Sequence, residues 1–183
     1  MIDSADPKQR LLAAWGWATT AAYLLTQAVA GLLGDADIPI MVLWAVAMAV
    51  PIAMTLRARG EGVGTLSAVW IGLVLLGMAE NVGVELLGAS EALEHFSFRT
   101  MWFLIGAVGF AYTAAVVTGS TRKAAYAAWA VANAVALGGL LVAYELFEGW
   151  AFVLAALIQG VPMLVDLPLR RAAHAPDRAL AAT

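Results

Sequence analysis

Long apolar runs follow one another along this chain, and each one ends at a short break that contains charged residues or glycine. A helix needs about 20 apolar residues to cross a hydrocarbon core of roughly 30 Å, because it rises about 1.5 Å per residue. The runs do not show the alternation that marks the short strands of a membrane barrel. The pattern therefore predicts six transmembrane helices, near residues 11–33, 38–56, 64–88, 99–118, 124–146 and 150–169.

Composition supports this interpretation. The chain has 183 residues, of which 63% are hydrophobic and 13% are charged, and its mean hydropathy is +0.85. Soluble domains are about half apolar and about one quarter charged. Six spans use about 120 positions, and the rest suffices for tails and turns. We expect residues 1–183 to form a single integral membrane domain, an all-α bundle of six transmembrane helices.

The basic residues fall on alternate connections between the predicted helices. One side of the membrane receives nine of the ten: Lys8, Arg10, Arg57, Arg59, Arg122, Lys123, Arg170, Arg171 and Arg178. Arg99 is the single exception. Positively charged connections stay in the cytoplasm, so the distribution predicts a multi-pass protein of the cell membrane with both termini cytoplasmic. Trp15 and Trp129 near the inner ends, and Trp102 and Trp150 near the outer ends, are expected to anchor the helices at the interfaces.

Two internal repeats compete in this sequence. Trp44 and Trp129 begin the similar stretches WAVAMAV and WAVANAV, which pair the second predicted helix with the fifth and favour an inverted repeat of three plus three helices. Inverted repeats are typical of transporters with a site near the midplane. The second and sixth helices also share Val-Leu and Val-Pro pairs, which favours three hairpins instead. Both alternatives stay open, together with no detectable repeat.

Polar residues within the predicted spans are the candidate functional residues. Glu80, Asn81 and Glu85 lie on the third helix, and Glu80 is about 12 Å inside its outer end. A carboxylate at such depth costs several kcal/mol unless it is protonated, paired or hydrated. Similar depths on other helices predict that an outward-opening ligand site also includes Gln27, Tyr144 and Glu145. The structural alternative is a protonated Glu80 bonded to a neighbouring helix, with Glu85 and Glu145 simply reaching the interface.

Three further polar residues are predicted to be structural. Asn133 and Gln159 lie deep in the fifth and sixth helices and are expected to join helices by hydrogen bonds. Asp166 precedes Arg170 by one helical turn, which predicts a salt bridge between them.

Several chemistries find no support in the sequence. The chain has no cysteine, and its two histidines, His95 and His174, are predicted on opposite sides of the membrane. We therefore expect no metal site and no cofactor. Known catalytic motifs such as HExxH and GxSxG are missing, so enzyme activity is unsupported. No basic stretch suggests nucleic-acid binding.

Three functional hypotheses remain. The leading one is a small-solute or ion transporter or channel with an outward-opening polar site on the third helix. The alternative is a non-catalytic membrane subunit or scaffold that docks a larger membrane complex, and the third is a lipid-modifying membrane enzyme. The expected partners are the lipid bilayer and either a second copy of the chain or another membrane protein.

Overall fold

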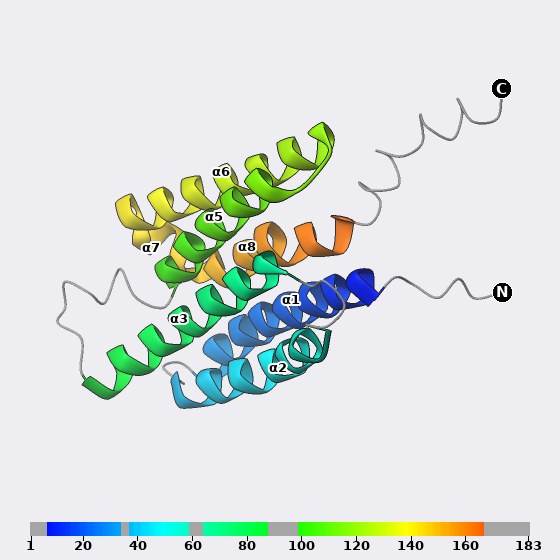
Figure 1. The fold of residues 1–183 in the computed structure, drawn as a ribbon. Helices are drawn as coiled ribbons and strands as arrows, with labels where there is room; N and C mark the ends of the chain where they lie inside the picture. Colours follow the sequence, from blue (N-terminus) through cyan, green and yellow to red (C-terminus); the bar gives the residue numbers. More distant parts are fainter. Residues whose placement is uncertain (1–6, 34–36, 59–63, 88–98, 167–183) are drawn as a thin grey trace, which may run out of the picture.

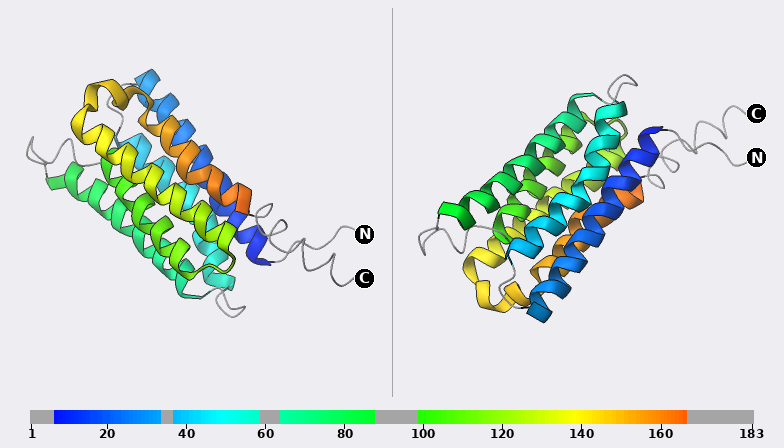
Figure 2. Two further views of the ribbon diagram at one scale, coloured as in Figure 1. Left: turned by 90° about the horizontal axis from the view of Figure 1, so that it is seen from above. Right: turned by 90° about the horizontal axis from the view of Figure 1, so that it is seen from below.

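The computed structural model describes residues 7–33, 37–58, 64–87 and 99–166, and these are almost entirely helical. The five longest helices are α1 (Pro7–Leu33), α2 (Asp37–Arg57), α3 (Thr65–Leu87), α5 (Arg99–Val116) and α6 (Ser120–Val142). They lie side by side along one direction (Figures 1 and 2).

The last span is irregular. It begins with a short helix and a 3₁₀ turn, continues as α-helix, passes through one π-helical turn and ends as helix at residues 161–166. The pieces are α7 (Tyr144–Phe147), η2 (Glu148–Trp150), α8 (Ala151–Ala155) and η3 (Ala156–Gly160). Short π-helical segments within α-helices occur frequently at functional sites.

Five stretches in the described residues are long and apolar enough to cross a membrane. They are Ile38–Arg57, Thr65–Val84, Arg99–Val116, Ser120–Val142 and Tyr144–Asp166. Helix α1 has 27 residues and is not among the five. It carries threonine, tyrosine and glutamine along its length, and these lower its hydropathy.

The first four predicted helices agree with the structure to within a few residues, whereas the fifth and sixth begin several residues earlier than predicted. Helix α6 begins after Gly119, whose φ of 89° requires a residue without a side chain, and it ends before Ala143. The predicted break between the fifth and sixth helices, residues 147–149, belongs to helical turns of α7 and η2. A glycine and a charged residue predict a loop there, but an interfacial helical turn accommodates both. Residues 167–169 lie outside the described residues.

The helices form a closed ring in chain order. Each of α1, α2, α3, α5 and α6 packs against the next one, and η3 closes the ring between α6 and α1. We call the end where α1 begins the proximal end; α6 also begins there, and α2 and α5 end there. The opposite end, where α7 lies, is the distal end (Figure 1). Side chains inside this ring form the core.

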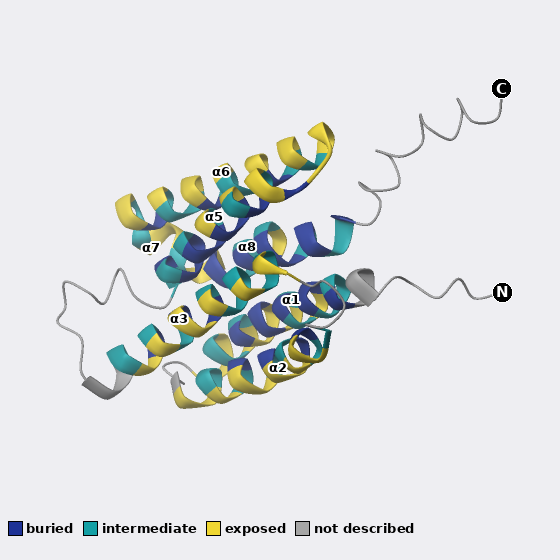
Figure 3. Cartoon of the chain, viewed as in Figure 1, coloured by how far each residue is buried: buried dark blue, intermediate teal, exposed yellow. Residues whose placement is uncertain are grey.

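The outer surface of the ring is apolar. Large aliphatic side chains are exposed on several helices, among them Leu24, Val46, Leu75, Val135 and Leu157. Figure 3 shows that buried residues face the interior and exposed residues face outward. Soluble monomers rarely expose apolar surface on such a scale. Together with the five apolar spans, this surface indicates a membrane-embedded protein.

Polar groups are instead turned inward, and tryptophan–threonine pairs join neighbouring helices. Trp15 Nε1 donates to Thr55 Oγ1 at 2.9 Å, and Trp44 Nε1 donates to Thr26 Oγ1 at 3.0 Å, both between α1 and α2. Trp70 of α3 donates to the Thr113 hydroxyl of α5 at 3.0 Å. In lipid, such bonds hold helices together where the hydrophobic effect does not.

The expected interfacial role of two tryptophans is wrong. Trp15 and Trp102 are buried in the core, with 8% and 4% of their surface exposed, because their indole N–H groups find partners on neighbouring helices. Trp150 at the distal end is 70% exposed, which fits an interfacial position. Position near a helix end therefore did not determine which way these rings point.

Candidate functional site: an axial column of polar and aromatic side chains

A buried hydrogen-bond network crosses the middle of the ring. Tyr23 of α1 donates its hydroxyl proton to Gln159 Oε1 at 2.6 Å. Gln159 Nε2 donates to Asn133 Oδ1 on α6 at 2.9 Å and to the Trp102 carbonyl on α5 at 3.0 Å. Asn133 Nδ2 donates to the carbonyls of Trp129 and Ile158. The predicted role of Asn133 and Gln159 in joining helices is thus confirmed.

The local backbone makes room for this network. Gln159 belongs to the π-helical turn η3, and two glycines lie against the network. A Cβ on Gly106 would collide with the Asn133 amide, and a Cβ on Gly160 would collide with the Thr20 hydroxyl. The Thr20 Oγ1 atom is buried and has no hydrogen-bond partner. The site therefore holds one unused hydroxyl next to a saturated pair of amides.

Aromatic rings fill the interior on the distal side of the network. Trp44 and Trp102 stack with centroids 4.9 Å apart and planes 13° apart. The Tyr23 ring meets Trp44 edge to face at 4.7 Å, and Phe152 lies 6.5 Å from Tyr23. These rings belong to the buried core and occupy the interior of the bundle on that side, in the edge-to-face and offset geometries that aromatic pairs prefer.

The predicted pair on α3 lies beside this aromatic cluster. Asn81 is buried, and in the amide orientation that satisfies its neighbours its Nδ2 donates to Glu80 Oε2 at 2.8 Å. Its Oδ1 accepts from Trp102 Nε1 at 3.2 Å. Glu80 is half-buried. Asn81 therefore links the carboxylate of α3 to α5.

Two other predicted residues lie at the distal end: Gln27 contacts the irregular segment, and Tyr144 belongs to it. Gln27 Nε2 donates to the Gly149 carbonyl at 3.0 Å, and Tyr144 accepts a 2.7 Å hydrogen bond from Arg99. Arg99 also lies 3.6 Å from Glu148 and covers the ring of Phe152. Arg99, the one basic residue outside the charge pattern, is thus accommodated by a carboxylate, a phenol and an aromatic face.

Of the six predicted site residues, Glu80 and Asn81 contact each other, and Asn81 also contacts Trp102 of α5. Gln27 contacts Gly149, and Tyr144 contacts Arg99 of α5. Glu145 is exposed, and the side chain of Glu85 lies outside the described residues. Buried atoms without a hydrogen-bond partner occur here too, at Gln27 Oε1 and Arg99 Nε.

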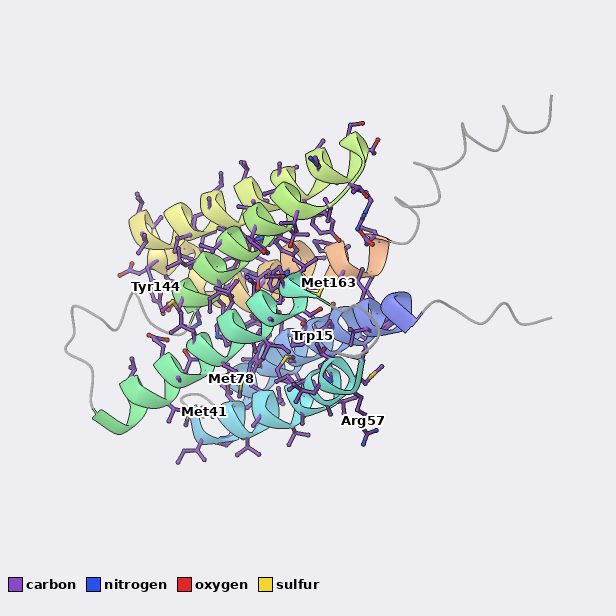
Figure 4. The ribbon with its side chains drawn as sticks, in the orientation of Figure 1. Trp15, Met41, Arg57, Met78, Tyr144 and Met163 are labelled. Atoms are coloured by element: carbon purple, nitrogen blue, oxygen red, sulfur yellow. The ribbon has the colours of Figure 1, made fainter. Side chains whose placement is uncertain are left out.

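A cavity of about 230 Å³ opens the interior at the proximal end. Its walls come from five helices of the ring, and most of the lining residues are apolar or aromatic. The lining residues are Leu11, Leu12, Trp15, Gly64, Leu66, Ser67, Trp70, Phe110, Thr113, Val117, Arg122, Tyr126 and Met163. Figure 4 shows two of them, Trp15 and Met163, on α1 and the last span, with Tyr144 toward the other end. We call this space the proximal cavity.

A buried ion pair lies beside the proximal cavity, and its arginine lines the wall. Arg122 of α6 donates through Nε and a terminal nitrogen to Asp166 Oδ1, at 3.0 and 2.9 Å. Tyr126 donates to the same oxygen at 2.8 Å. Asp166 is fully buried. The predicted partner Arg170 lies outside the described residues, so the pairing between Asp166 and Arg170 stays a prediction.

The sequence contained only part of the signal for these features. Asn133 and Gln159 are recognisable in the sequence as polar residues at depth, whereas Arg122 resembles any other charge on a cytoplasmic turn. No protein-family model matches the chain, and neither a curated protein nor a solved structure matches it. Function must therefore be argued from the geometry.

Proposed function

We propose that the chain is a six-span protein of the cell membrane with both termini cytoplasmic. The sixth span in this proposal is α1, which at 27 residues is about 40 Å long. Its polar residues Thr19, Tyr23 and Thr26 are buried, while Trp17 and Leu24 on its outer face are exposed. The low hydropathy of α1 thus comes from the face that lipid would not touch.

The orientation follows from charge. Arg57 ends α2, and Arg122 and Lys123 lie in the first turn of α6, all at the proximal end. Arg99, at the distal end, is paired with Glu148. The positive-inside rule then makes the proximal end cytoplasmic.

The absence of cysteine allows a direct test of this topology. Ser120 and Glu145 are exposed at opposite ends of α6 and the turn after it, so each is replaced by cysteine in turn. An impermeant maleimide added to intact cells should label Glu145→Cys, and it should label Ser120→Cys only after permeabilisation. The reverse pattern would invert the proposed orientation, and labelling of both from outside would refute the span between them.

Within the membrane, we propose a small-solute or ion transporter or channel. The observation that carries this proposal is the axial column: the proximal cavity leads toward a polar network at mid-span, and stacked rings close the far side. Met163 lines the cavity one turn beyond Gln159, so the cavity reaches close to the network. The network sits on an irregular span, as solute sites in transporters do.

In this proposal, the structure represents a state that is open toward the cytoplasm. The outward-opening site expected around Glu80 and Asn81 belongs, in this proposal, to a second state in which the distal rings separate. Asn81 accepts from Trp102, one of the two stacked indoles, so separation of the rings would change the environment of Glu80 directly. Alternating access of this kind moves the closure from one side of a fixed site to the other.

The test is solute flux in proteoliposomes, followed by light scattering for uncharged solutes and by ion-sensitive dyes for protons and alkali cations. We expect flux above that of protein-free vesicles for at least one solute, and a change of about tenfold or more in Gln159→Leu, since the amide contacts of the path are lost. The matched control is Leu157→Ala, because Leu157 is two residues away and is exposed on the outer surface of the bundle. Glu80→Gln should alter the pH dependence of the same flux.

Two outcomes would overturn transport. One is a flux indistinguishable from protein-free vesicles for every solute and ion tested, with protein shown to be folded and inserted. The other is a measured flux that neither Gln159→Leu nor Glu80→Gln changes. Absence of flux together with a stoichiometric membrane partner in purified complexes would favour the subunit hypothesis.

A further inference from the structure

We propose that the proximal cavity is a binding site for a compact, uncharged aromatic molecule about the size of two fused rings. The proposal concerns the cavity itself, and it stands whether or not the chain transports a solute. Three properties of the cavity carry it: its volume, the chemistry of its walls and its charge.

The volume limits the ligand from both sides. The cavity measures about 230 Å³. An apolar protein cavity of about 150 Å³ takes up benzene, whereas pockets for drug-sized ligands measure about 300–1,000 Å³. A ligand that fills the proximal cavity is therefore larger than one ring and smaller than a typical drug. Two fused rings satisfy both limits.

The walls favour a flat aromatic ligand. Four aromatic side chains line the cavity: Trp15, Trp70, Phe110 and Tyr126. The Trp70 ring meets Phe110 at 5.1 Å and 66°, and Phe110 stacks on Tyr126 at 6.0 Å. Aromatic pairs gain about 0.5–1.5 kcal/mol beyond the burial of area, so each such wall favours a ring over an aliphatic chain of equal size.

The indole N–H groups of the two tryptophans already have hydrogen-bond partners and are not available to a ligand. Trp15 Nε1 is bonded to Thr55, and Trp70 Nε1 is bonded to Thr113. Both rings therefore offer only carbon atoms to the cavity. The hydroxyl of Ser67 adds one small polar group to the wall, which suits a ligand with a single hydroxyl or ring N–H.

The charge of the wall excludes an ionic ligand. Among the described residues of the lining, Arg122 alone is charged, and its guanidinium is held by two hydrogen bonds to Asp166, so the pair has no net charge. A charged ligand would lose its hydration without meeting a free counter-charge, which costs several kcal/mol. A neutral ligand meets no such cost.

The cavity also lies inside the ring rather than on its lipid surface. Its lining residues come from α1, α3, α5, α6 and the last span, and a groove on the lipid surface between two neighbouring helices would not touch all five. An acyl chain of a bilayer lipid would have to leave the lipid layer to enter. A small molecule dissolved in water or in the interface reaches the cavity from the proximal end.

The probe for this proposal is 2-naphthol, which is uncharged at neutral pH. Purified full-length protein in phosphatidylcholine nanodiscs is titrated with it, binding is followed by energy transfer from tryptophan, and partition into empty nanodiscs is subtracted. We expect saturable binding of about one molecule per chain. The affinity for the anion 2-naphthoate and for the cation 2-naphthylmethylammonium should be lower by a factor of about ten or more. At equal concentration, 1-decanol should not displace the bound probe.

Two filling variants locate the site. Ser67→Phe places a ring in the cavity and should abolish saturable binding, whereas Ala68→Phe, on the exposed side of the same helix, should keep it. Leu12→Trp fills the same cavity from α1 and should act like Ser67→Phe, which keeps the test valid if one variant does not fold. Gln159→Leu should leave 2-naphthol binding unchanged even where it abolishes flux.

Several results would overturn the proposal. The first is binding that never saturates, and the second is binding that both filling variants retain. The third is equal affinity for the charged analogues or displacement by 1-decanol, which would make the cavity an unselective apolar cleft. Phospholipid that co-purifies with the wild type and is lost from Ser67→Phe would identify an acyl chain as the occupant and overturn it as well.

Discussion

In the part of the chain that the structure describes, each end of the ring carries one arginine–carboxylate pair, and the two pairs differ in burial and geometry. At the proximal end Arg122 and Asp166 lie 2.9 Å apart, with side chains 12% and 1% exposed, and Tyr126 bonds the same carboxylate. At the distal end Arg99 and Glu148 lie 3.6 Å apart, with side chains 29% and 42% exposed. The first pair is short, buried and supported by a phenol. The second is longer and partly exposed.

The packing of the interior follows the opposite order: the end with the stronger ion pair has the less filled interior. The proximal end, with the strong pair at its wall, is hollow, whereas the distal end is filled by Trp44, Trp102, Tyr23 and Phe152. The proximal end is therefore held together by contacts at its wall, and the distal end by its filled interior. A cavity persists only if the helices around it are fixed by something other than packing across it, and the buried pair provides this.

The most severe test of this comparison removes the charge of Asp166. Asp166→Asn keeps the shape of the side chain but leaves Arg122 without its counter-charge in a buried position. Breaking such a pair costs about 3–5 kcal/mol of the free energy of unfolding. The loss is measured by denaturant unfolding in detergent micelles. Glu145→Gln, an exposed carboxylate, is the control and should change little. A loss below about 1 kcal/mol would show that the proximal end does not depend on the pair.

The filled interior of the distal end is tested by Trp102→Leu. The substitution removes the ring stacked on Trp44 and the donor to Asn81, and leaves a partly empty space. Replacement of a buried tryptophan by alanine costs about 3–5 kcal/mol, and leucine retains part of the contact, so we expect about 2–3 kcal/mol. The same unfolding measurement applies, with Trp150→Leu as the exposed control. Equal effects of the two substitutions would contradict a core-held distal end.

The sequence predicted the helices well, because length and hydropathy determine them directly. It also identified Asn133 and Gln159 as residues that join helices, since an amide at that depth needs a partner. Sequence position determines only how deep a residue lies along its helix. The rotation of each helix about its axis and the choice of its neighbours decide which residues meet, and these depend on packing among all the helices. Gln27, for example, hydrogen-bonds the Gly149 carbonyl, a partner that its depth alone does not predict.

The proximal end was the least predictable part. Local spacing suggested Arg170 as the partner of Asp166, whereas the described partner Arg122 is 44 residues away in sequence. The proximal cavity left no signal at all, because an empty space is a property of five helices together and not of any run of residues. Glycines at close approaches, such as Gly106 and Gly160, acquire their meaning only once the neighbouring helix is known.

The smallest expected effect concerns the distal pair. Glu148→Gln removes a carboxylate that is 42% exposed and 3.6 Å from Arg99, while Arg99 keeps its hydrogen bond to Tyr144 and its position over Phe152. Exposed pairs of this kind contribute about 0–1 kcal/mol, so we expect a change in unfolding free energy of about 0.5 kcal/mol or less. Raising the salt concentration should shrink it further, since exposed charges are screened. A loss comparable to that of Asp166→Asn would mean that both ends are held at their walls, and the distinction between the two ends would fail.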